Sequence, residues 1–146
     1  MKAILIVFLS VCAFAGPYCG HPIHKPLIFK GHFTFISASS PECKTLLSEN
    51  QYEAKHFQMG PTGTLSVLHL VGEGALSGIT MVGLLGPDCD FSGDKDVIVD
   101  EMKRHIHVEG LVNRSILWFE MRLDDFQSGE KICKVRAEFT GSPAQR

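Results

Sequence analysis

The sequence has little that favours helices. Its 14 glycines and 7 prolines are spread along the chain, and no window keeps an apolar i, i+3, i+4, i+7 stripe for more than two turns. Asp94 to Arg104 is the best candidate for a short helix. Internal repeats and low-complexity tracts are also absent. These absences argue against a helical or repeat architecture and point to strands.

An excess of charge of one sign is lacking too. Lys and Arg number 14 against 16 Asp and Glu, for a formal net charge of -2. No basic patch or arm stands out. Because proteins that bind nucleic acids neutralise phosphates with clustered Lys and Arg, this balance argues against a nucleic-acid partner.

Long apolar runs are absent after the first residues. Met1 to Ala15 combines an early lysine, an apolar run from Ala3 to Leu9 and a small-residue site at its end, which predicts a secretory signal peptide cleaved after Ala15. The run is shorter than the roughly 20 residues of a spanning helix. We therefore expect a secreted protein without a transmembrane segment. Residues 16–146 then have the size of a single domain.

We expect no free cysteine in the mature chain. Cys12 leaves with the signal peptide, and the remaining cysteines are Cys19, Cys43, Cys89 and Cys133. An even number in an oxidising route predicts two disulfides, with three pairings open. The same route makes the sequon Asn113-Arg114-Ser115 usable for N-glycosylation, which would place Asn113 at the surface.

Strand signals recur at intervals broken by turns. The expected strands are Phe29–Phe35, Tyr52–Met59, Leu65–Val71, Ile79–Leu85 and Lys103–Val108. Two further stretches, Ile116–Leu123 and Ile132–Phe139, predict a closing hairpin around residues 124–130, with Cys133 on its apolar face. Many short strands at such spacing predict an all-β sandwich or barrel.

The position of Cys133 suggests a pairing. Because it lies on the buried side of the last strand, its partner must approach from the core or from the end of the fold, and Cys19 is the natural candidate. Cys43 and Cys89 each follow a proline-containing turn and could bond to each other if those loops meet.

Signatures of catalysis and metal binding are weak. No Gly-x-Ser-x-Gly elbow is present, paired cysteines leave no thiolate nucleophile, and residues 72–78 lack the ending of a phosphate loop. Asp124-Asp125 fits turn chemistry. His105-Ile106-His107 places two imidazoles on one face of a strand, but no third ligand is identifiable, so a solvated strand face is the favoured interpretation. We expect neither an enzyme nor a bound metal or cofactor.

Two strands are apolar on both faces, Leu65–Val71 and Ile79–Leu85. One interpretation is a central strand with one face covered by a loop. The other is an apolar cavity between two splayed sheets, whose walls must be apolar although no side chain fills the space.

Several segments resemble one family. Cys19-Gly20, Ser40-Pro41-Glu42-Cys43, residues 78–83 leading into Pro87-Asp88-Cys89, and the closing residues 118–133 are similar in order to the ML (lipid-recognition) domain family, which includes the Niemann-Pick type C sterol carrier, the ganglioside activator and mite group two allergens. The resemblance implies an immunoglobulin-like β-sandwich of two antiparallel sheets, with a lipid between them and a bond between first and last cysteines.

This resemblance makes a secreted lipid- or sterol-binding protein the leading hypothesis. Binding would come from burial of apolar surface. The expected cavity residues are Phe33, Phe35, Phe57, Val67, Ile79, Met81, Phe119, Met121 and Val135. The alternative is a secreted immunoglobulin-like interaction module or effector with a filled core, acting on a cell-surface receptor.

Overall fold

The computed structural model of this chain is all-β, and it describes residues 25–47, 50–59 and 65–144. The strands are β1 (Leu27–Ala38), β2 (Tyr52–Met59), β3 (Leu65–Val71), β4 (Ile79–Leu85), β5 (Asp90–Val99), β6 (Met102–Val112), β7 (Leu117–Gln127) and β8 (Glu130–Pro143). A 3-10 helix, η3 (Pro41–Leu46), follows β1. Within the described ranges, no helix is long and apolar enough to cross a membrane. The predicted signal peptide and Cys19 lie outside those ranges.

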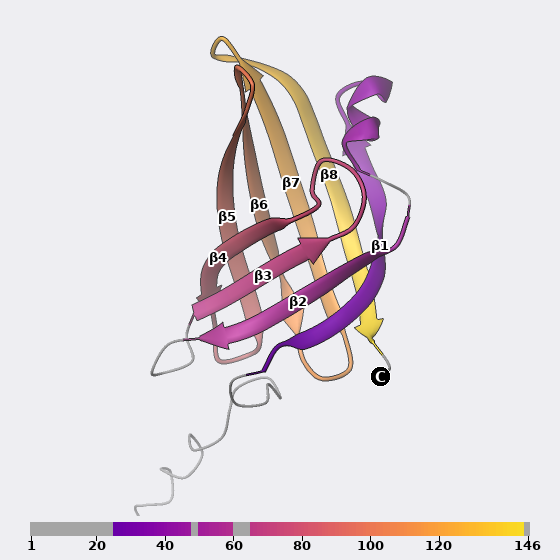
Figure 1. Cartoon of the computed structure of the whole chain (residues 1–146), viewed down its shortest axis with the longest axis vertical. Coiled ribbons are helices and arrows are strands. Elements are labelled where there is room, and N and C mark those ends of the chain that lie inside the picture. Colours follow the sequence, from indigo (N-terminus) through magenta and orange to yellow (C-terminus); the bar gives the residue numbers. More distant parts are fainter. Residues whose placement is uncertain (1–24, 48–49, 60–64, 145–146) are drawn as a thin grey trace, which may run out of the picture.

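The eight strands form one closed antiparallel barrel in the order β1 to β8. β1 closes it, since it pairs with β2 through Leu27–Gly31 and with β8 through Phe29–Ala38. In Figure 1, β2, β3 and β4 run obliquely across β5 to β8. The all-β prediction is therefore confirmed. The expected sandwich of two separate sheets is replaced by two layers of one continuous sheet.

Glycines at two places allow the sheet to turn from one layer into the other. Gly31 lies opposite Gly141 on β8, and Gly83 lies opposite Gly93 on β5. A Cβ atom at Gly31 would lie 2.1 Å from the Thr140 carbonyl oxygen, and one at Gly83 would lie 1.6 Å from that of Ser92. Only glycine fits such a close backbone approach, which is typical of sharp bends at barrel corners.

Aromatic rings fill the space between the layers. Phe33 packs against Tyr52, Phe119 and Phe139 with ring centroids 5.1, 5.9 and 5.2 Å apart. Phe119 and Phe139 stack at 4.9 Å. All of these side chains are buried. A small eight-stranded barrel is either filled by its own side chains or holds one small ligand, and these contacts correspond to the filled arrangement.

The predicted strands are largely confirmed. β2, β3 and β4 have the predicted bounds, and the closing hairpin is formed by β7 and β8. The predicted helix over Asp94–Arg104 is wrong: this segment contains most of β5, a turn with Asp100 at φ 57°, and the start of β6. Ten cross-strand pairs from Asp90 to Val99 stabilise it as a hairpin.

The turn of the closing hairpin is tighter than predicted. Ser128 and Gly129 both have positive φ, 52° and 82°, as a two-residue hairpin turn of the primed type requires. Asp124 and Asp125 therefore both belong to β7, and the expectation that they serve turn chemistry is wrong. The Asp125 carboxylate accepts two hydrogen bonds from Arg104, at 2.7 and 2.8 Å, and the side chains of Asp125 and Arg104 are 2% and 5% exposed.

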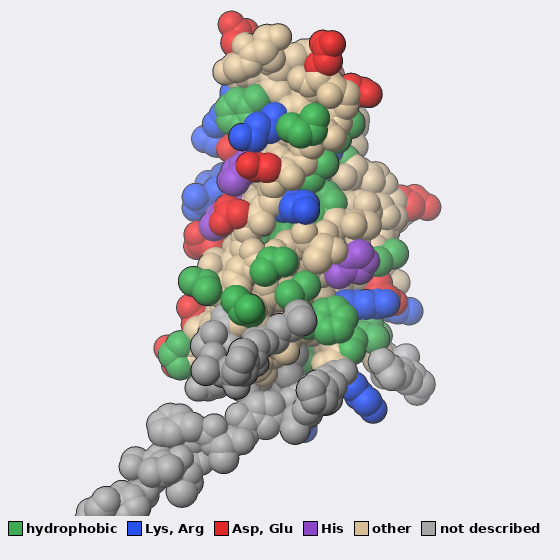
Figure 2. Space-filling model, turned by 60° about the vertical axis from the view of Figure 1, so that its left-hand side comes forward, with side chains coloured by type: hydrophobic (Ala, Val, Ile, Leu, Met, Phe, Trp, Pro, Cys, Tyr) green, Lys and Arg blue, Asp and Glu red, His purple; other side chains and the backbone are tan. Residues whose placement is uncertain are grey.

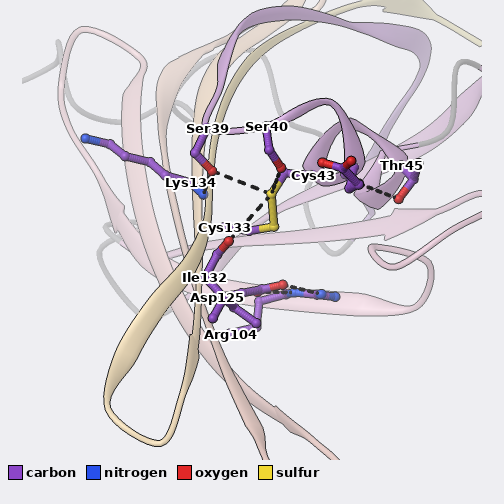
Figure 3. Close-up of a disulfide and its surroundings, with 10 residues drawn as sticks. Ser39, Ser40, Cys43, Thr45, Arg104, Asp125, Ile132, Cys133 and Lys134 are labelled. Carbon is purple, nitrogen blue, oxygen red and sulfur yellow. Dashed lines mark hydrogen bonds and ion pairs between the residues drawn. A yellow bond between two sulfur atoms is a disulfide. The ribbon is translucent and has the colours of Figure 1, made fainter.

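The disulfide pattern also differs from the prediction. Cys43 bonds to Cys133, with their Cα atoms 5.7 Å apart, so the Cys19–Cys133 and Cys43–Cys89 pairings are wrong. Cys89 is disulfide-bonded as well. Figure 3 shows the Cys43–Cys133 bond joining η3 to the start of β8, beside the Arg104–Asp125 pair. The partner of Cys133 comes from the segment that covers this end of the barrel.

Replacing Cys43 and Cys133 together by serine should lower the free energy of unfolding by about 2–5 kcal/mol, because the bond closes a long loop in the unfolded chain. Urea denaturation monitored by circular dichroism measures this change. Non-reducing peptide mapping of the unmodified protein should recover a peptide pair that links Cys43 to Cys133. A pair linking Cys19 to Cys133 would contradict the structure.

Candidate functional site

A groove of about 780 Å³ lies on the outer surface of the barrel, across β4 to β7. The face where β4 and β5 lie is turned forward in Figure 2, which shows apolar side chains gathered below a zone of histidine and acidic side chains. The groove is lined by Leu84, Leu85, Gly86, Asp90, Phe91, Ser92, His107, Glu109, Gly110, Leu111, Trp118, Glu120 and Arg122.

Strand register arranges the outward side chains of the groove in three rows. Leu111 of β6 lies between Asp90 of β5 and Trp118 of β7 in the first row. The second row contains Ser92, Glu109 and Glu120, and the third contains Asp94, His107 and Arg122. Because outward residues recur every second position along a strand, the carboxylates of the second row lie between the apolar residues of the first row and the basic residues of the third.

The apolar end of the groove is open to solvent. Leu84 is 65% exposed and Leu111 is 46% exposed, while Trp118 is partly buried. Burying large apolar side chains that water now contacts is favourable for any ligand that covers them. This end can therefore take the apolar part of a ligand.

The carboxylates of the groove differ in how their charge is balanced. Two nitrogens of Arg136 donate to Oε1 of Glu120 at 3.0 and 2.7 Å, and Arg122 lies 3.7 Å from the same oxygen. The hydrogen bonds from Arg136 lower the pKa of Glu120. Among the residues that the structure describes, the Glu109 carboxylate has a single partner, Nε2 of His107 at 2.7 Å. Among the described residues, no side chain balances the charge of Asp90.

His107 lies between two carboxylates. Its Nδ1 is 2.8 Å from Oδ1 of Asp94, and its Nε2 is 2.7 Å from Oε1 of Glu109. Partial burial lowers the pKa of His107, but its hydrogen bonds with Glu109 and Asp94 together outweigh burial and hold the pKa above its ordinary value. A neutral imidazole has one N–H and can donate to only one of these carboxylates, so the arrangement favours the imidazolium.

His105 shares the same outer face, as its spacing from His107 predicted. Its Nε2 lies 3.3 Å from Oδ1 of Asp94, and its Nδ1 is hydrogen-bonded to Asp96. That bond lowers the pKa of Asp96. Within the described part of the chain, no group of His, Cys, Asp and Glu is arranged to hold a metal ion. The two histidines are therefore best described as members of a surface network of ion pairs.

The residues predicted to line a lipid cavity are divided between the inner and outer faces. Six of them are buried inside the barrel: Phe33, Ile79, Met81, Phe119, Met121 and Val135. Phe35 is partly buried and packs against this core. Phe57 and Val67 lie opposite each other on β2 and β3 and are only partly buried. They alternate with buried residues and so belong to the outer face, contrary to the prediction.

Sequence reasoning missed the groove, although one signal was present. Trp118 alternates with the buried residues Leu117 and Phe119, so it belongs to the face that carries Glu120 and Arg122. Leu111 likewise follows Glu109 on the outer face of β6. Large apolar side chains on a charged strand face are the feature that indicates a surface site.

Asn113 lies in the turn that joins β6 to β7 and is exposed. Its Oδ1 accepts hydrogen bonds from the backbone N–H groups of Ser115 and Ile116, at 2.7 and 3.1 Å. The side chain is thus at the surface, as its sequon predicted, close in sequence to Leu111. Its glycosylation stays a prediction.

No known protein family, no curated protein and no solved structure matches this chain in the comparisons. The resemblance to the ML family therefore stays a prediction, and the function has to be argued from the groove itself.

Replacing Glu109 by glutamine should lower the pKa of His107, because it removes one of the two carboxylates that favour the imidazolium. A histidine whose pKa is raised by folding stabilises the fold below its unfolded pKa, and this contribution is lost as pH rises through the folded value. NMR titration of the His107 ring measures the pKa. Glu138→Gln is the matched control, since Glu138 lies on β8, and the described partners of His107 are Asp94 and Glu109. An unchanged His107 pKa in Glu109→Gln would contradict the geometry.

Proposed function

We propose that this chain is a secreted, non-enzymatic binding protein that holds an amphipathic ligand in the groove across β4 to β7. The observation that carries the proposal is the contrast between the barrel's two faces. The inside is filled by packed aromatic rings, whereas the outside keeps exposed apolar side chains beside charged ones.

The size and lining of the groove support this function. Small-molecule sites are typically about 300–1,000 Å³ and combine apolar walls with a few polar groups that orient the ligand; the groove, at about 780 Å³, lies in this range. Leu84, Leu111 and Trp118 offer the apolar wall. The second and third rows offer the polar groups.

Binding of a lipid or sterol between the layers, which the family resemblance implies, has less support. A ligand there would have to separate rings such as Phe119 and Phe139, which stack at 4.9 Å. Close packing of this kind stabilises a core, and opening it costs the contacts of every ring displaced. A lipid-class ligand is better accommodated by the groove.

The second candidate function is the filled-core interaction module that acts on a protein receptor. It is favoured by outward apolar residues that lie beside the groove. Val82 is 55% exposed and Leu65 is 42% exposed, and Leu65 lies directly opposite Leu84. Contiguous exposed apolar patches often mark protein-binding surfaces. A small amphiphile and a receptor would use neighbouring parts of the same face.

Binding in the groove should change the fluorescence of Trp118, the only tryptophan of the chain. We expect decylamine, decanol or decanoate, each below its aggregation concentration, to shift its emission in a saturable way. Leu84→Ser should weaken that binding about tenfold, because it removes exposed apolar surface that the ligand would cover.

Leu65→Ser is the matched control, because Leu65 faces Leu84 across the two strands but does not line the groove. It should leave the affinity unchanged. If none of the three amphiphiles changes the Trp118 emission, or if Leu65→Ser and Leu84→Ser weaken binding equally, the proposed function is wrong. A lipid that binds with no change at Trp118 would instead favour the interior.

A further inference from the structure

We infer that the polar group of the groove's ligand is an organic cation, an amine held by the carboxylates of Glu109 and Asp90, and that His107 makes its binding dependent on pH. This inference rests on the proposed function, because it specifies the ligand class of the same groove.

The charges that line the groove are predominantly negative. Asp90, Glu109 and Glu120 contribute carboxylates, against the guanidinium of Arg122 and the imidazole of His107. Glu109 and Glu120 lie directly opposite each other, and like charges in that position repel. Arg136 relieves the repulsion at Glu120 alone. When His107 is neutral, a bound cation would relieve it at Glu109.

The order of the rows also selects a cation. A ligand seated on Leu111 and Trp118 has Asp90 beside it in the same row and Glu109 in the next row. Neighbouring outward positions along a strand are separated by roughly 7 Å. Arg122 stands one row further from the apolar end, and it already faces Glu120 at 3.7 Å. A polar group attached to the apolar body therefore meets carboxylates before it meets a cation.

Trp118 adds a second preference for positive charge. A cation over the face of an indole ring is attracted by the ring's electrons. Trp118 lines the groove between the exposed Leu111 and the charged Glu120. An alkylamine or aromatic amine would thus contact apolar, aromatic and anionic groups together, whereas an anion of the same shape would contact only the first two favourably.

His107 is placed to compete with such a cation. Protonated His107 donates hydrogen bonds to Glu109 of β6 and to Asp94 of β5, so it neutralises the Glu109 carboxylate that the amine requires. Arg122 of β7 lies directly opposite His107, and His105 of β6 contacts Asp94 as His107 does. When His107 loses its proton, the charge of Glu109 becomes available. Amine binding should therefore strengthen as pH rises, and bound amine should favour the neutral imidazole.

The three decyl amphiphiles test the ligand class, since they share one apolar chain and differ in charge. Titration calorimetry at about pH 7.5, where aliphatic amines are cations and carboxylic acids are anions, should give decylamine an affinity about tenfold above decanol and decanoate. Glu109→Gln should remove most of this advantage. Glu138→Gln should preserve it, because Glu138 shares the second row but lies outside the groove lining.

The outcomes separate the two proposals. If decanol or decanoate binds in the groove as tightly as decylamine, or if Glu109→Gln leaves the amine's advantage intact, the inferred preference for a cation is wrong. Binding of an amphiphile in the groove would still be supported. If no amphiphile binds, the proposed function is wrong, and so is the inferred cationic ligand.

The role of His107 is tested by the pH dependence of decylamine binding. Decylamine should bind several-fold more weakly at about pH 5.5 than at about pH 8.5, an upper value chosen because the pKa of His107 lies above its ordinary value; the amine stays protonated at both. In His107→Gln the affinity should be the same at both values, because glutamine carries no titrating proton. Equal pH dependence in His107→Gln and the unmodified protein would overturn the role of His107.

Discussion

The pairing of β1 with β8 is the constraint on which the rest of the structure depends. It joins the first and last described strands in a ladder that begins where Phe29 faces Pro143 and ends where Ala38 faces Val135. The result is one continuous ring of strands. A closed ring removes the free edges on which strands of other molecules could pair. It also fixes, for every strand, which alternate side chains point inward, and so it determines the core and the surface together.

Large rings occupy inward positions between the layers, and neighbouring backbones approach closely at the corners of the sheet. Glycine at the corners permits the close approach, and Phe33, Phe119 and Phe139 interlock across the gap that remains. At the end covered by η3, the inner face changes character and carries the buried ion pair of Arg104 with Asp125. Such a pair is costly to break, since a lone buried charge would remain. The Cys43–Cys133 bond holds the covering segment beside it.

Local pattern was sufficient to predict the strands but not what they form together. Short apolar segments bounded by turn residues located β2, β3 and β4 to the residue. Local pattern failed for Asp94–Arg104 because that hairpin depends on cross-strand partners that no local window contains. The pairing of Cys133 depends on where η3 lies, and sequence spacing does not specify this position. The groove was missed for a related reason: four strands contribute to it, and only their register brings Leu84, Leu111 and Trp118 to one place.

Because packed rings fill the barrel, the binding function that we propose uses the outer face, and there the same alternation decides the chemistry. Residues two apart on β6 place Leu111, Glu109 and His107 in successive rows. The order matters more than the composition, because a net charge near zero for the whole chain says nothing about which group a ligand meets first. Beside the exposed leucines it meets carboxylates, and the positive charge next to Glu109 is one that the protein can remove by deprotonating His107. A surface with that order is suited to an amphiphile whose charged end is positive.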